Sequence, residues 1–190
     1  MIRTVNDLIS NNDIMLLRSN RKQDEVYTPF YAVDILLEFL PKDKIIWLPF
    51  DEEWSAFNQR LTELGYTVTR SSLKEGKNFF EYEPENWDIL VSNPPFSCKD
   101  DVLERVLSFN KPFALLLPIA VIQGKKRHSM FMNDIQMLVP DIRINFMLGF
   151  GAGDYQKANY FGSAYFCRGL LPSKLELRTL KRYERPLKKE

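Results

Sequence analysis

Short apolar runs alternate with amphipathic stretches through the middle of the chain. The apolar runs fall at 44–48, 66–70, 87–92 and 112–117, and the amphipathic stretches between them include 55–64 and 100–109. Runs of this length favour buried strands, whereas apolar side chains three and four positions apart favour helices. Strands that alternate with helices are typical of βαβ units on a mostly parallel sheet. The pattern therefore predicts an α/β fold.

The run 87–92 is the strongest strand candidate. Its centre is Ile89-Leu90-Val91, and Asn93-Pro94-Pro95 follows directly. A hydrogen-bonded ladder cannot continue through two prolines, because proline has no N–H to donate. We therefore expect a buried central strand that ends immediately before Asn93.

The region after the fourth apolar run is predicted to complete the sheet. Residues 130–138 have a helical pattern, and 142–148 and 163–170 read as strands that could form an antiparallel pair at a sheet edge. The glycine-rich stretch 149–159 between these two strands is expected to be a flexible loop.

A length of 190 residues with 45% hydrophobic content is enough for one sizeable core. We therefore expect a single domain over 1–190, with its core at about 27–171. Helices are expected within 1–20, and the charged tail 181–190 is expected to be frayed and solvated.

The charge balance limits how the chain could bind nucleic acid. Lys and Arg number 26 against 25 Asp and Glu, so a net charge of +1 provides no general attraction to phosphates. A local site is still available at Lys125, Lys126 and Arg127, which follow the run 112–117. Three adjacent cations can neutralise phosphates, but a solvated basic loop explains them equally well.

Membrane and metal sites are both disfavoured. No apolar run reaches the roughly 18 residues of a membrane span, and the first residues lack the apolar run of a signal peptide. We therefore expect a cytoplasmic protein without membrane contact. Cys98 and Cys167 match no metal-ligand spacing, so no metal is expected.

Asn93-Pro94-Pro95-Phe96 is the segment with the most distinctive chemistry. It follows a predicted strand of a parallel sheet, and ligands collect at the carboxyl ends of such strands. The Asn93 amide and the Pro94 carbonyl offer acceptors for both hydrogens of an exocyclic amino group. The prolines make the backbone rigid, and Phe96 offers a ring face for an extruded base. A rigid turn that only ends the strand is the alternative.

With these residues the chain resembles the S-adenosylmethionine-dependent methyltransferases that act on the amino group of adenine in DNA, especially small phage and bacterial orphan enzymes. Tyr27-Thr28-Pro29 is similar to the family segment that closes over the methionine part of the cofactor. Asn78 and Phe79 are placed like the loop that contacts the cofactor adenine. The resemblance implies a Rossmann-like class I methyltransferase fold, S-adenosylmethionine as cofactor and DNA as partner.

The loop after the first predicted strand departs from that family pattern. Most members have glycines there, but the segment 49–55 contains none. We interpret Pro49 and Phe50 as cofactor contacts and Asp51 as a candidate acceptor for the cofactor ammonium group. Ser55 could cap the following helix or donate to the cofactor carboxylate. A solvated acidic helix cap is the competing interpretation of Asp51 and Ser55.

Other functions and assemblies stay open at this point. A catalytically inactive methyltransferase-like domain could bind nucleic acid or a protein, and the glycine-free loop is compatible with it. The Asn-Pro-Pro-Phe segment also does not distinguish adenine in DNA from adenine in RNA. A homodimer or a separate partner subunit is compatible with the sequence.

Overall fold

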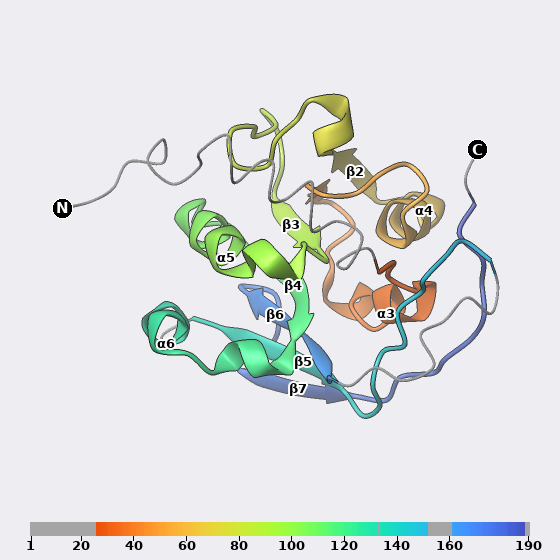
Figure 1. Ribbon diagram of the computed structural model, residues 1–190. Helices are drawn as coiled ribbons and strands as arrows, with labels where there is room; N and C mark the ends of the chain where they lie inside the picture. The colour runs from red at the N-terminus through yellow and green to blue at the C-terminus, as the bar shows by residue number, and fades with distance from the viewer. Residues whose placement is uncertain (1–25, 133, 152–160, 189–190) are drawn as a thin grey trace.

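The computed structural model describes residues 26–132, 134–151 and 161–188. The helices expected within 1–20 and most of the loop expected at 149–159 lie outside these residues. Seven strands form one sheet in the order β2-β1-β3-β4-β6-β5-β7 (Figure 1). Their bounds are β1 Ile45–Leu48, β2 Thr67–Arg70, β3 Ile89–Ser92, β4 Phe113–Pro118, β5 Gln136–Pro140, β6 Ser163–Arg168 and β7 Leu175–Arg178.

The first four strands lie where the apolar runs predicted them. β1 pairs in parallel with β2 and with β3, and β3 pairs in parallel with β4. The helices α4 (Ala56–Glu63) and α5 (Lys99–Ser108) also confirm their predicted positions. Gly65 ends the α4 region at a φ of 77°, a conformation that favours glycine. The predicted α/β fold with a mostly parallel sheet is therefore confirmed.

β6 is the antiparallel strand of the sheet, paired with β4 on one side and with β5 on the other, and this corrects two predicted elements. Residues 136–140 form a strand and not the end of a helix, because Leu138 packs in one core and Met137 against the other. Residues 142–148 form no strand, and only Met147 makes a single bridge, to Tyr27. Both edges of β6 are already paired, with β4 and β5, so no edge was left for a strand at 142–148. β7 extends the sheet beyond β5 in parallel.

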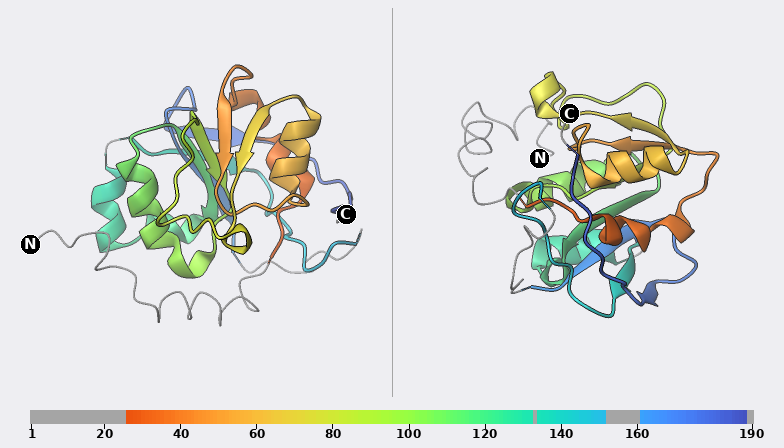
Figure 2. Two further views of the ribbon diagram at one scale, coloured as in Figure 1. Left: turned by 90° about the horizontal axis from the view of Figure 1, so that it is seen from above. Right: turned by 90° about the vertical axis from the view of Figure 1, so that its right-hand side faces the viewer.

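Helices cover both faces of the sheet (Figures 1 and 2). On one face α3 (Phe30–Asp34) and α4 pack on Ile46, Val91 and Tyr165. On the other face α5 packs on Trp47, Leu90 and Phe166, and α6 (Lys125–Phe131) packs partly on the same core. Alternate residues of β1, β3, β4 and β6 thus enter opposite cores, as the two-residue period of a strand requires.

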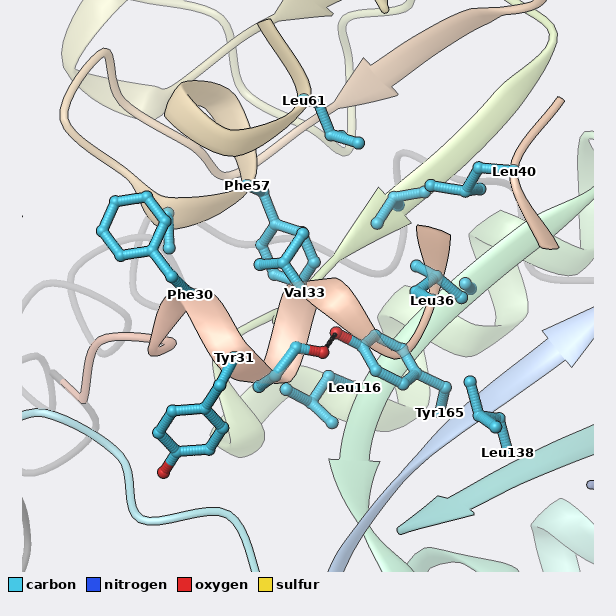
Figure 3. Packing of buried hydrophobic residues seen from close by; sticks show 14 of the residues in the cluster. Phe30, Tyr31, Val33, Leu36, Leu40, Phe57, Leu61, Leu116, Leu138 and Tyr165 are labelled. Carbon is cyan, nitrogen blue, oxygen red and sulfur yellow. Dashed lines mark hydrogen bonds between the residues drawn. The ribbon is translucent and has the colours of Figure 1, made fainter. Parts of the chain in front are cut away.

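The core under α3 and α4 is closed by long-range contacts. Figure 3 shows Val33, Phe57 and Leu61 pointing from the two helices toward the sheet. The buried hydroxyl of Tyr165 on β6 donates to the carbonyl oxygen of Ala32 at 2.8 Å. This hydrogen bond satisfies a polar group that would otherwise be costly to bury.

The last described segment does not fray. Leu187 is 5% exposed and packs in the same core as α3 and α4. Most of residues 181–188 are exposed, as expected of a solvated tail, but the buried Leu187 side chain anchors the segment to the core. In the described residues, no helix has the length and apolarity that crossing a membrane requires.

Candidate active site

A cavity of about 430 Å³ opens at the carboxyl ends of β1, β2 and β3. Parallel strands end at one edge of the sheet, so the loops that follow them meet there. The structure brings many of the predicted site residues into the wall of this cavity. They are Tyr27, Pro49, Phe50, Asn78, Phe79, Asn93, Pro94, Pro95 and Phe96.

The Asn93 amide is held in one orientation at the end of β3. Its Nδ2 donates to Thr28 Oγ1 at 3.1 Å, and Thr28 itself is buried. The other amide atom, Asn93 Oδ1, is buried and has no hydrogen-bond partner among the described residues. Buried polar atoms are nearly always hydrogen-bonded. The wall of the cavity therefore contains an oriented acceptor that still requires a donor.

Phe96 follows the two prolines and begins the short 3-10 helix η4 (Phe96–Cys98), which leads directly into α5. Its ring meets Phe146 and Phe161 edge to face, with centroids 6.3 Å and 5.7 Å away. These edge contacts fix the ring, which is only partly buried and also lines the cavity.

Three further rings form an aromatic wall of the cavity, made of Tyr27, Trp54 and Phe150. Their ring centroids lie 4.9 to 5.0 Å apart in all three pairs. Tyr27 is fixed by two backbone hydrogen bonds of 2.8 Å with Met147. The sequence predicted only Tyr27, because the rings come from three segments that meet only in the fold.

The loop after β1 presents Glu52 to the cavity and not the predicted Asp51. Asp51 is 7% exposed, and its Oδ2 has no hydrogen-bond partner among the described residues. Burial raises the pKa of Asp51 to about 7, while a hydrogen bond with Ser55 lowers it and the nearby Glu52 carboxylate raises it further. Asp51 therefore lies beneath the cavity.

Glu52 is held at the wall by two contacts. Lys74 Nζ lies 2.5 Å from Glu52 Oε1, and Trp54 Nε1 donates to Glu52 Oε2 at 3.1 Å. Sequence reasoning missed Glu52, because in an irregular loop no periodicity tells which of three adjacent acids faces the cavity. The acidic run 51–53 in the loop after β1 was the available signal.

The loop after β2 completes the cavity. Arg70 pairs with Glu75, so this cation is already neutralised. Ser72 lines the cavity, and its buried Oγ has no hydrogen-bond partner among the described residues. Asn78 Oδ1 accepts from the N–H of Phe80 at 3.2 Å, which shapes the loop.

Three other predicted cofactor contacts do not line the cavity. Thr28 orients Asn93. Pro29 is the residue before the first turn of α3. Ser55 Oγ accepts from the N–H of Asn58 at 3.2 Å and so caps α4, in agreement with the helix-cap interpretation.

The predicted basic loop is the first turn of α6, and none of its cations lines the cavity. Arg127 Nη1 lies 2.8 Å from Asp100 Oδ1, and Lys126 Nζ lies 3.2 Å from Glu104 Oε2. Both partners belong to α5. Two of the three cations therefore already have anionic partners inside the fold.

Among the residues with described positions, no group of three or more His, Cys, Asp or Glu side chains could hold a metal ion. The cavity wall presents neutral acceptors, aromatic rings, the Glu52 carboxylate and the cations Lys74 and Lys77.

No protein-family model matches the sequence, and no curated protein matches it. The chain is similar to a solved structure from Listeria monocytogenes that is provisionally described as a class I S-adenosylmethionine-dependent methyltransferase. The identity is 12%, the TM-score is 0.44, and the similarity covers 81% of this chain and 65% of that one. The chain thus spans less than two thirds of that protein. A likeness of this size carries no argument about activity, which depends on the site residues.

Proposed function

We propose that this protein transfers the methyl group of S-adenosylmethionine to the N6 amino group of an adenine in DNA. The observation that supports this most directly is the oriented, partnerless Oδ1 of Asn93 in the cavity wall. An acceptor of this kind suits an N–H donor, and the amino group of adenine is such a donor.

The acceptors would act by alignment. Asn93 Oδ1 and the Pro94 carbonyl oxygen take one hydrogen each from the amino group and point its lone pair at the methyl carbon. Alignment of two reactants can supply a large part of a rate enhancement. The rigid Pro94-Pro95 backbone keeps these acceptors in place, and Phe96 stacks on the base, a contact worth about 1 to 3 kcal/mol.

The cavity also fits the cofactor. Its volume of about 430 Å³ lies in the range of small-molecule sites, roughly 300 to 1,000 Å³. S-adenosylmethionine, when bound, supplies a methyl group that its sulfonium charge has already activated. The aromatic wall favours a cation, and the cofactor ammonium group would compete with Lys74 for the Glu52 carboxylate. The partnerless Ser72 hydroxyl would bind a polar group of the cofactor.

The rival function is a catalytically inactive domain that binds nucleic acid or a protein. The glycine-free loop after β1 favours this rival, because its side chains hinder close contact between the loop backbone and a ligand. Titration calorimetry with S-adenosylmethionine and with its demethylated product separates the two functions. Saturable heat is expected for the enzyme and no heat for the inactive domain.

The test of the proposal is methyl transfer from labelled S-adenosylmethionine to double-stranded DNA, single-stranded DNA and RNA. We expect label on adenine N6, with DNA as the better acceptor. The Asn93→Ala variant should lose at least about two orders of magnitude in rate, the scale for a positioned polar group, with unchanged circular dichroism. Near-normal transfer by this variant would remove Asn93 from the active site, and preferential labelling of RNA would change the substrate.

A further inference from the structure

The third ring of the aromatic wall is attached to a distant part of the chain. The N–H of Leu187 donates to the carbonyl oxygen of Phe150 at 3.1 Å. The Leu187 side chain is 5% exposed and packs in the core under α3 and α4. A backbone hydrogen bond beside a buried leucine fixes the two segments relative to one another.

Residues 183–188, here called the strap, run along α3 and α4 on the outside of the molecule (Figure 1). Side-chain contacts tie the strap to both helices at several points. They join Tyr183 to Asp34 at 2.6 Å, Arg185 to Glu63 at 2.9 Å, Arg185 to the Phe30 ring centroid at 4.0 Å, and Lys188 to Gln59 at 2.7 Å.

The two helices that the strap contacts directly follow the segments with the other two rings of the wall. Tyr27 lies just before α3, and Trp54 lies just before α4. A single segment therefore contacts Phe150 and the two helices that follow Tyr27 and Trp54. Contacts with one shared segment fix the relative positions of the three rings better than three independent loops could, because a loop alone has few buried contacts.

We propose that the strap is a positioning device for the aromatic wall, which holds Phe150 against Tyr27 and Trp54 and so sets the affinity of the cavity for S-adenosylmethionine. This rests on the proposed function for the identity of the ligand. Leu187 acts through Phe150 and touches no reacting atom, so it is a positioning residue.

The experiment compares Leu187→Ala with Leu180→Ala. Leu180 is 4% exposed in the same core, but its N–H donates to Asp141 and not to the wall. Both variants lose a similar buried side chain and should have a similarly lowered melting temperature. Only Leu187→Ala is expected to raise the Kd for S-adenosylmethionine, by about five- to tenfold, the scale of a lost cation–π contact. Its kcat at saturating cofactor should stay unchanged.

A fluorescence measurement without cofactor tests the role of the strap independently of the proposed function. Trp47 and Trp87 are 0% and 4% exposed, whereas Trp54 is only partly buried, so acrylamide quenching of tryptophan fluorescence reports mainly on Trp54. Leu187→Ala should raise the quenching constant by about twofold, as the ring contact of Phe150 loosens. Leu180→Ala should leave it unchanged.

A milder variant guards against loss of folding. Arg185→Gln removes the ion pair to Glu63 without opening the core, and should shift Kd and quenching in the same direction by less. Equal quenching in the Leu187 and Leu180 variants would overturn the strap proposal. If the parent protein binds no S-adenosylmethionine, the proposed function fails, while the quenching comparison still decides the role of the strap.

Discussion

The Asn93 amide can serve a substrate amino group only while its oxygen, and not its nitrogen, faces the cavity. Thr28 enforces this orientation, because its Oγ1 accepts from Asn93 Nδ2 at 3.1 Å. In an irregular loop the side chain would otherwise rotate between two orientations of similar energy. The buried threonine is therefore as much a part of the site as the asparagine that it holds.

Replacing Thr28 by Val keeps the size of the side chain and removes the acceptor. We expect methyl transfer to fall by about three- to tenfold, which corresponds to the net contribution of one hydrogen bond, roughly 0.5 to 1.5 kcal/mol. The measurement is kcat with labelled cofactor. Thr67→Val is the matched control, since Thr67 is exposed on β2, away from the cavity wall. Equal losses in the two variants would contradict this role of Thr28.

Asp51 illustrates a carboxyl group that affects stability through pH. Its pKa rises from the usual 3.8 to about 7 in the folded protein, mainly because burial disfavours the charged form. The folded state therefore binds the proton more tightly than the unfolded state does. This contribution to stability is fully present below the unfolded pKa and is lost as the pH rises through the folded pKa.

Asp51→Asn removes this dependence while keeping the shape of the side chain. We expect the difference in melting temperature, variant minus parent, to increase by about 4 °C or more as the pH rises from about 5 to about 8. The reason is that a tenfold difference in proton affinity between the unfolded and folded states corresponds to about 1.4 kcal/mol of stability. Thermal melts of both proteins across this range provide the measurement. Parallel curves would mean that Asp51 is ionised in the folded protein at every pH tested.

At the level of elements, the first turn of α6 is engaged with α5. Arg127 and Lys126 meet Asp100 and Glu104, which lie on the side of α5 that faces α6. A cation that already has a carboxylate partner displaces fewer counterions from DNA, because contact with a phosphate competes with its ion pair. The position of a basic cluster in the sequence therefore overstates the positive charge that is available to DNA.

Replacing Lys125, Lys126 and Arg127 together by Ala should weaken DNA binding less than the replacement of three unpaired cations would. We expect the logarithmic salt slope to fall by less than about 1, because each phosphate contact on duplex DNA contributes about 0.9. Fluorescence anisotropy at several salt concentrations measures this slope. A loss near three contacts would show that DNA displaces both ion pairs to α5.

The same element makes a separate contribution to folding. Arg127 has 17% side-chain exposure in its ion pair with Asp100, whereas Lys125 is exposed. The largely shielded pair is expected to stabilise the contact between α5 and α6, while an exposed cation adds little. Arg127 therefore contributes to the packing of α6 on α5, while the substrate role of the cluster stays a prediction.

At the scale of the whole molecule, the cavity lies where the loops of three strands, the segment before α3 and the segment that ends at Phe150 converge. A ligand in this cavity contacts several segments that are far apart in the chain. Such a ligand binds the folded state only, and so it stabilises the whole domain by mass action.

S-adenosylmethionine at about one hundred times its Kd should raise the unfolding free energy by about 2.7 kcal/mol. For a domain of this size the melting temperature should rise by about 5 to 10 °C. Differential scanning fluorimetry is the measurement, and the demethylated product should produce a change of similar size. Free methionine at the same concentration is the control. An unchanged melting temperature with the cofactor would favour the inactive-domain alternative.

The sequence by itself determined the parts of the fold that depend on local pattern. The strands at 45–48, 89–92 and 113–118 were predicted to within two residues, because a strand buried on both faces must be a short apolar run. The partly exposed strand 67–70 was predicted from the residues that bound it, Gly65 on one side and Ser71-Ser72 on the other. The position of Asn93 at the cavity was also predictable, since two prolines must end a strand and the ends of parallel strands meet.

Only the tertiary structure decided which side chains face the cavity and which segments join at its wall. Asp51 and Glu52 are neighbours of the same chemical type, and only the packing of α4 on the sheet turns one inward and the other toward the cavity. Residues 136–140 became a strand because β6 offered an edge. Phe150 entered the site because Leu187 and Met147 bind neighbouring backbone. Such contacts join residues far apart in the chain, so their energy depends on the completed fold and leaves no periodic signal in the sequence.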